Sequence, residues 1–130
     1  MTQPRSFLLV DDDIDDILIF QDTLKKVDEK IQLFYVHDGK DALDFLANNN
    51  GHLPSLIFLD INMPIVDGFV FLYEFEKFNE IVRNKCKVII LSSSDNKRDI
   101  DKIVNNNHVI KFITKPLTEV ALDEIKLNNI

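Results

Sequence analysis

Five apolar stretches of four to six residues alternate along the chain with longer stretches in which apolar and polar residues mix. The apolar stretches are Ser6–Val10, Ile31–Val36, Leu56–Leu59, Val88–Leu91 and Val109–Thr114. Short apolar runs that do not alternate with polar positions are typical of strands buried on both faces of a sheet. We therefore expect five β-strands.

The segments between these runs carry apolar residues near helical spacing, which predicts amphipathic helices. The predicted helices run from Ile14 to about Val27, over Ala42–Leu46, from Phe69 through Phe75 or Phe78, from Asp95 to about Val104, and from the N-cap Thr118 through Ile125. Strands that alternate with helices form a parallel sheet, because each parallel connection crosses over through a helix. The pattern predicts one α/β domain over residues 1–130, a doubly wound parallel sheet with helices on both faces.

Composition and charge narrow the class of protein. The chain has 130 residues, of which 45% are hydrophobic and 28% charged, as expected for a soluble globular domain with its own core. The net charge of −7 argues against a nucleic-acid partner, because phosphate contacts need a basic surface. No apolar run approaches the roughly 18 residues of a membrane span, and no signal peptide is visible. With Cys86 as the single cysteine, we expect a cytoplasmic protein.

Polar residues end or follow four of the predicted strands. Asp11 and Asp12 follow the first, Asp60 the third, Ser92 the fourth and Lys115 the fifth. The carboxyl ends of parallel strands share one edge of the sheet, and ligands bind in the crevice there. We expect an acidic pair, a single carboxylate, a hydroxyl and an ammonium group to meet at this edge, which suits the transfer of a phosphoryl group to a carboxylate.

The roles of these residues follow from phosphoryl chemistry. Asp60 can form an acyl phosphate, as carboxylate nucleophiles do. The transferred group must then be positioned and its equatorial oxygens neutralised. Mg²⁺ would neutralise one oxygen and Lys115 a second, and the Ser92 hydroxyl would hydrogen-bond the third. Asp11 and Asp12 suit Mg²⁺, which takes one or two protein carboxylates and completes its shell with phosphate and water. The neighbouring carboxylates are interpreted as a solvated helix start; they are Asp13, Asp15 and Asp16.

With these residues in place, the chain resembles the receiver domain of two-component response regulators. The matching motifs, in family order and at family spacing over nearly the whole chain, are Val10-Asp11-Asp12, Leu59-Asp60-Ile61-Asn62-Met63-Pro64 with Asp67-Gly68, Ser92, and Lys115-Pro116. The resemblance implies a flavodoxin-like fold with strand order 2-1-3-4-5. It also implies that a sensor histidine kinase or a phosphotransfer protein phosphorylates Asp60, and that the chain is a signalling phosphoacceptor whose only catalysis is its own phosphorylation and dephosphorylation.

The resemblance also assigns the remaining site residues. Asp12, Asp60 and the backbone carbonyl of Asn62 would ligate Mg²⁺, with Asp11 acting through water. Ser92 would be the hydroxyl of the conformational switch, and Lys115 would contact the phosphoryl group. The Lys115–Pro116 peptide bond is typically cis in such proteins.

The aromatic partner of the switch departs from the family pattern, as do two neighbouring features. Phe112 stands where the family often has Tyr, Ser92 replaces the commoner Thr, and Asn106-Asn107-His108 replaces the small residues that often precede the last strand.

Since no effector domain is visible, output would pass through a surface change read by a downstream protein, or through onward phosphotransfer. The protein would be a monomer or a phosphorylation-linked dimer. The run Asp11–Asp16 is also similar to stand-alone receivers that serve sensor kinases, some of them linked to phytochromes.

Two other classes share parts of this pattern. An aspartate-nucleophile phosphatase of the haloacid dehalogenase type uses similar groups, but has a second Asp two residues after the nucleophile, where this chain has Asn62. A flavodoxin-type flavin site needs a hydroxyl- and glycine-rich loop after the first strand, where Asp11-Asp12-Asp13 would repel the phosphate. Other candidates are expected to be structural: Cys86 as an inert thiol, and the histidines His37, His52 and His108 as surface or turn residues.

Overall fold

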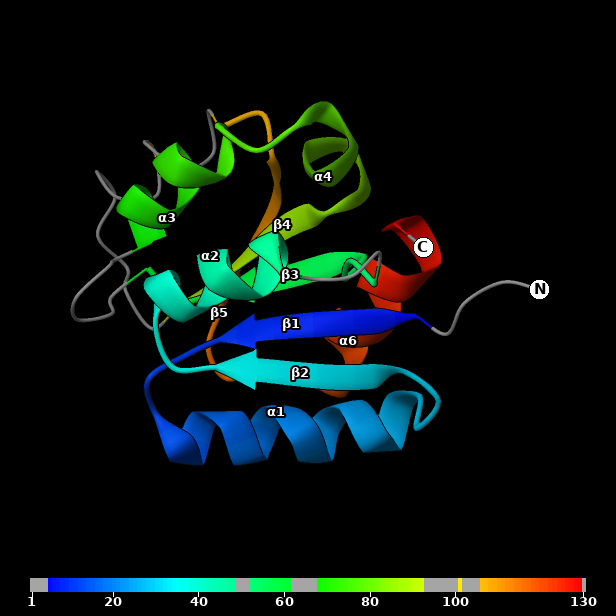
Figure 1. Ribbon diagram of the computed structural model, residues 1–130. Coiled ribbons are helices and arrows are strands. Elements are labelled where there is room, and N and C mark those ends of the chain that lie inside the picture. The colour runs from blue at the N-terminus through cyan, green and yellow to red at the C-terminus, as the bar shows by residue number, and fades with distance from the viewer. Residues whose placement is uncertain (1–4, 49–51, 62–67, 93–100, 102–105, 130) are drawn as a thin grey trace.

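The computed structural model describes residues 5–48, 52–61, 68–92, 101 and 106–129. Its strands are β1 (Ser6–Val10), β2 (Gln32–Val36), β3 (Leu56–Leu59), β4 (Lys87–Ser92) and β5 (Val109–Thr114). They form one parallel sheet in the order β2-β1-β3-β4-β5, which confirms the predicted fold class (Figure 1).

Helices cover both faces of this sheet, as predicted. The described helices are α1 (Ile14–Val27), α2 (Gly39–Ala47), α3 (Gly68–Phe75), α4 (Glu80–Lys85) and α6 (Glu119–Asn129). Helices α1 and α6 contribute to the apolar cluster on one face, and α2, α3 and α4 contribute to the cluster on the other. In the described part of the chain, no helix has both the length and the apolar character needed to cross a bilayer.

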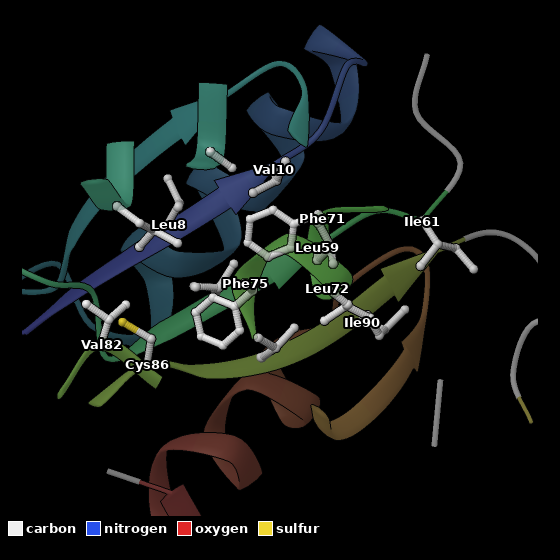
Figure 2. Packing of buried hydrophobic residues seen from close by; sticks show 14 residues of the cluster. Leu8, Val10, Leu59, Ile61, Phe71, Leu72, Phe75, Val82, Cys86 and Ile90 are labelled. Atoms are coloured by element: carbon white, nitrogen blue, oxygen red, sulfur yellow. The ribbon is translucent and has the colours of Figure 1, made fainter. Parts of the chain in front are cut away.

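Strand β1 shows how the sheet divides the core. Leu8 and Val10 belong to the cluster under α2, α3 and α4, whereas Phe7 and Leu9 belong to the cluster with α1 and α6. Side chains alternate between the two faces of a strand, so a strand buried on both faces must be apolar at every position. Figure 2 shows the cluster under α2, α3 and α4, in which Phe71 and Phe75 of α3 pack with Leu8 and Val10 of β1.

The edge strands differ from the prediction of burial on both faces. Strands β1 and β3 are buried throughout, but β2 and β5 contain exposed and half-buried positions, including Tyr35 and Ile110. An edge strand has a neighbouring strand on one side only, so fewer side chains cover it and some of its residues stay exposed.

The segment after α3 also differs from its prediction. Helix α3 ends at Phe75, so Phe78 lies outside it, and a separate helix α4 follows that the apolar spacing did not predict. Asn79 is the N-cap of α4, and its side chain accepts a hydrogen bond of 3.1 Å from the backbone N–H of Val82. The helix predicted from Asp95 to about Val104 lies, apart from Asp101, outside the described residues.

Helix caps fix the chain close to the carboxyl ends of the strands. Asp13 caps α1 and accepts hydrogen bonds from the N–H groups of Asp15 and Asp16. Thr118 accepts a hydrogen bond of 3.1 Å from the N–H of Ala121, which confirms it as the predicted cap of α6. These caps fix where α1 begins after β1 and where α6 begins after β5.

Gly68, the first residue of α3, packs directly against Ile61, the residue that follows Asp60. Its N–H donates a hydrogen bond of 3.2 Å to the carbonyl of Ile61. A Cβ atom at Gly68 would lie 2.6 Å from the Cα of Ile61, a separation that excludes any larger residue without movement of the backbone. Glycine therefore permits the start of α3 to pack directly against the residue that follows Asp60.

Candidate functional site

The carboxyl ends of β1 and β3 bring three carboxylates together. Asp11 and Asp60 directly follow these strands, and their backbone N–H groups continue the sheet hydrogen bonds to Val36 and Val10, at 3.1 and 3.0 Å. Asp11 is 1% exposed and Asp60 7%, whereas Asp12 is exposed. One carboxylate oxygen from each of the three lies within 4.8 Å of the other two. The structure thus assembles the predicted acidic site.

Lys115 reaches this cluster from the end of β5. Its Nζ atom donates hydrogen bonds to Asp11 Oδ2 at 2.8 Å and to Asp60 Oδ2 at 3.1 Å. The Lys115 side chain is only 12% exposed. The Lys115–Pro116 peptide bond is cis, as the resemblance implied. Direct contact between the lysine and Asp60 is the geometry that the predicted role of Lys115 requires.

Asp16 is part of the same network, which corrects its interpretation as a solvated residue at a helix start. Lys115 Nζ donates a third hydrogen bond of 2.8 Å to Asp16 Oδ2, and the Asp16 side chain is 35% exposed. Asp13 and Asp15 are exposed and agree with the helix-start interpretation. Asp16 is therefore a residue of the site that the sequence interpretation missed.

The pKa values of Asp11 and Lys115 are both raised, and in each group burial and ion pairing act in opposite directions. Burial raises the pKa of Asp11 above the ordinary carboxyl value, and hydrogen bonds from Lys115 and from the backbone N–H of Asp13 offset part of this shift. Burial alone would lower the pKa of Lys115, but hydrogen bonds to Asp11 and Asp16 and the charge of Asp60 raise it overall. Lys115 is therefore a permanent cation at the site.

The donor set fits a hard divalent cation. Asp11, Asp12 and Asp60 offer only carboxylate oxygens, which Mg²⁺ and Mn²⁺ accept, and these oxygens lie close enough to share one ion. In this arrangement the Lys115 ammonium contacts two of the three carboxylates and supplies part of the positive charge that a metal would bring. Asn62, whose backbone carbonyl is the other predicted ligand, lies outside the described residues.

The two predicted switch residues lie on neighbouring strands. Ser92 is the last residue of β4 and is paired in register with Thr114 of β5, while its side chain lies outside what the structure describes. Phe112 is paired with Ile90 of β4, is half-buried, and packs against the apolar cluster under α2, α3 and α4. Two residues of β5, Ile113 and Thr114, separate Phe112 from Lys115 along the chain.

The remaining candidates are structural, as predicted. Cys86 is fully buried between α4 and β4, and burial raises the pKa of its thiol to about 12. A thiol with so high a pKa is a poor nucleophile. His108 packs edge-on against the ring of Phe75, with ring centroids 5.3 Å apart. Among the described residues, the acidic cluster is the one group with metal-binding geometry, and it contains no histidine.

Comparison with known proteins agrees with this geometry. The family model of the response regulator receiver domain matches residues 7–126. The response regulator Rcp1 of Synechocystis is 33% identical over 101 residues, which cover 75% of this chain and 67% of Rcp1. These similarities give no support to the phosphatase alternative.

Solved structures are similar over nearly the full chain. A two-component response regulator from Cytophaga hutchinsonii is 29% identical, with a TM-score of 0.87 over 97% of this chain and 96% of that one. The phosphorylated cyanobacterial phytochrome response regulator RcpA is 27% identical, with a TM-score of 0.83 over 98% and 97% of the two chains. The Mn²⁺-bound form of Rcp1 is 29% identical, with a TM-score of 0.78 over 95% and 90%.

Proposed function

Because the chain belongs to the receiver-domain family of response regulators, we propose that Asp60 is the residue that receives the phosphoryl group. The observation that carries this assignment is the position of Asp60 between two other carboxylates and the Lys115 ammonium group. Its carboxylate lies in the three-carboxylate cluster that suits a divalent cation, and it accepts a hydrogen bond from the Lys115 ammonium group. Residues 1–130 would act as a single receiver domain.

The proposed transfer is a displacement at phosphorus. An Asp60 carboxylate oxygen forms the new O–P bond while the P–N bond to a histidine of the donor breaks. The electron pair of that bond stays on the imidazole nitrogen, which takes up a proton. Lys115 remains beside the phosphoryl oxygens, where its charge offsets the negative charge of the transferred group. The same residues would serve the later attack of water, so the only catalysis is the protein's own phosphorylation and dephosphorylation.

Mg²⁺ is the proposed cofactor, held by Asp12, Asp60 and the backbone carbonyl of Asn62, with Asp11 acting through water. When bound, it supplies positive charge that neutralises a phosphoryl oxygen. The carboxylate-only donor set supports this choice, and the Mn²⁺-bound form of Rcp1 is the related precedent. The direct test of the whole proposal is the intact mass after incubation with phosphoramidate and Mg²⁺, which should increase by one phosphoryl group.

Thermal unfolding in Mg²⁺ and in EDTA tests the metal site separately. A cation that binds only the folded state at about ten times its dissociation constant should stabilise it by about 1.4 kcal/mol, which raises Tm by several degrees. Asp12→Asn removes an exposed ligand without disturbing the core, so it should abolish most of this increase. An equal increase in the variant would contradict the assignment of Asp12.

The same experiment has a predicted pH dependence. Since burial raises the pKa of Asp11, this group stabilises the metal-free protein at acid pH, and the contribution is lost as pH rises through the raised pKa. Mg²⁺ requires the deprotonated carboxylate. The difference in Tm between Mg²⁺ and EDTA should therefore be largest near neutral pH and vanish as pH falls through the pKa of Asp11.

Output is proposed to pass through Ser92 and Phe112. The Ser92 hydroxyl would hydrogen-bond a phosphoryl oxygen, and its inward movement would leave space for the half-buried Phe112 ring to pack more deeply. The pairing of β4 with β5 supports this coupling, since Phe112 stands two residues before Thr114, the partner of Ser92. A ligand shifts a conformational equilibrium only when it binds the two states differently, so both residues should respond to phosphorylation.

Beryllofluoride with Mg²⁺, a mimic of the phosphoryl group, tests this output. Amide NMR shifts are expected at Ser92, at Phe112 and in residues 97–104, and Phe112→Ala should remove the shifts in 97–104 while those next to Asp60 remain. Shifts confined to the loops after Asp11 and Asp60 would contradict this route and favour onward phosphotransfer as the output.

The proposed function includes partner proteins and a location in the cell. The phosphoryl donor would be a sensor histidine kinase or a phosphotransfer protein, and the recipient of the signal a downstream protein rather than a nucleic acid, consistent with the net charge of −7. The protein would act in the cytoplasm, as a monomer or a phosphorylation-linked dimer.

A further inference from the structure

We propose that Asp16 is a positioning residue that holds Lys115 while the other carboxylates of the site are engaged by the metal and the phosphoryl group. The inference rests on the proposed function and adds to it a residue outside the three-carboxylate cluster. Its basis is the hydrogen bond of 2.8 Å between Lys115 Nζ and Asp16 Oδ2, as short as the bond from Lys115 to Asp11.

The hydrogen-bonding capacity of Lys115 is fully used. An ammonium group has three N–H donors and no acceptor. The structure gives it three carboxylate acceptors, on Asp11, Asp16 and Asp60. Any new partner, such as a phosphoryl oxygen, must therefore replace one of these three bonds.

Two of the three bonds compete with the proposed chemistry. Asp11 and Asp60 belong to the carboxylate cluster that suits a divalent cation, so the ammonium and a metal ion would share their oxygens. Asp60 would also carry the phosphoryl group. Two cations at one site repel each other, so metal binding should weaken the contacts of Lys115 with Asp11 and Asp60.

Asp16 is the partner that Lys115 can retain. It lies outside the three-carboxylate cluster and in the first turn of α1, where the helix dipole favours a carboxylate. The helix around it is fixed by the neighbouring residues Ile17 and Phe20, which are 3% and 1% exposed. A charged side chain on a rigid element can keep the ammonium oriented beside Asp60 after its other partners are withdrawn.

Asp16→Asn tests this role with Mg²⁺ alone. Without Asp16, the ammonium depends on Asp11 and Asp60 and competes more strongly with the metal. The apparent dissociation constant for Mg²⁺ should rise about tenfold, as is common when a residue that supports a metal site from outside the ligand shell is lost. Asp16→Glu, which keeps the charge, should recover most of the affinity.

Asp15→Asn is the matched control, because Asp15 is the preceding, exposed carboxylate of the same helix turn. It removes the same charge, and none of the hydrogen bonds described for Lys115 involves it. If Asp16→Asn and Asp15→Asn weaken Mg²⁺ binding equally, the effect is one of general charge and the role of Asp16 is refuted.

The side-chain ammonium signal of Lys115 in ¹H–¹⁵N spectra gives a readout that folding alone would not move. In the wild type and in Asp15→Asn the signal should persist when Mg²⁺ is added, since Asp16 still slows its exchange with water. In Asp16→Asn it should broaden beyond detection on Mg²⁺ addition, although backbone amide spectra show a folded protein. A signal that persists equally in Asp16→Asn would overturn the proposal.

Failure of this inference is distinguishable from failure of the proposed function. A wild type that binds Mg²⁺ but is not phosphorylated on Asp60 contradicts the function and leaves the metal and ammonium measurements decisive for Asp16. A wild type that is phosphorylated, with Asp16→Asn indistinguishable from Asp15→Asn, refutes only the role of Asp16. A wild type that binds no Mg²⁺ refutes both.

Discussion

Asp60→Asn protein incubated with phosphoramidate and Mg²⁺ is expected to keep its unmodified mass, under conditions in which the wild type gains one phosphoryl group. An amide oxygen is a far weaker nucleophile than a carboxylate, and removal of a nucleophile typically lowers a rate by about a thousandfold or more. Asparagine has nearly the same shape and still offers an oxygen to the Lys115 ammonium, so the variant should fold. Intact-mass spectrometry at several incubation times measures the loss.

A matched control and a metal arm make the result specific. Asp22→Asn removes an exposed carboxylate of α1 that pairs only with Lys26 at 3.2 Å among the salt bridges described, and its labelling should equal that of the wild type. EDTA should suppress labelling of both the wild type and Asp22→Asn. If Asp60→Asn is still labelled at the wild-type rate, the phosphoryl group goes to another side chain and the assignment of Asp60 is wrong.

The sequence was sufficient to predict the part of the site that depends on strand ends. An apolar run that stops at an aspartate marks both a buried strand and the point where the chain leaves it, so the sequence alone places Asp11 and Asp60 at one edge of the sheet. Lys115 followed by the same reasoning from β5. The parallel sheet converts these separations of tens of residues into contacts of about 3 Å.

Asp16 was missed because its contact depends on the direction of a helical side chain. Side chains of an α-helix point back toward its N-terminus, and the N-terminus of α1 lies at the carboxyl end of β1. A residue in the first turn can therefore reach the crevice that precedes the helix. The three carboxylates Asp13, Asp15 and Asp16 look alike in sequence, and only the position of α1 relative to Lys115 distinguishes Asp16 from Asp15.

The other differences also have physical causes. Helix α4 begins at a cap, Asn79, and is only six residues long, so it is too short to show a clear apolar period. The apolar runs of β2 and β5 did not reveal that these are edge strands, because strand order follows from the paths of the connections and not from the composition of a strand.

Replacement of Lys115 by alanine is expected to have the largest effect after loss of Asp60. Its removal leaves the carboxylates of Asp11 and Asp60, which are 2% and 9% exposed, without their ammonium partner. An uncompensated charge in such a place typically destabilises a protein by about 3 kcal/mol, so the free energy of unfolding in EDTA should fall by that order. Mg²⁺ replaces part of the missing positive charge, so it should stabilise Lys115→Ala by more than it stabilises the wild type.

Binding of beryllofluoride, the phosphoryl mimic, should separate the role of Lys115 in stability from its role in signalling. A hydrogen bond to a charged group contributes about 1.5–3 kcal/mol. Loss of the bond from Lys115 should therefore weaken the affinity for beryllofluoride roughly 10- to 150-fold. Lys111→Ala is the matched control, because Lys111 lies on β5, the strand that Lys115 follows, and its ion pair with Glu124, at 3.8 Å, joins side chains that are 39% and 59% exposed. Amide NMR titration in saturating Mg²⁺ should show a wild-type response in Lys111→Ala and a greatly weakened one in Lys115→Ala. An undiminished response in folded Lys115→Ala would mean that the lysine only balances the charge of the acidic cluster and takes no part in binding the phosphoryl group.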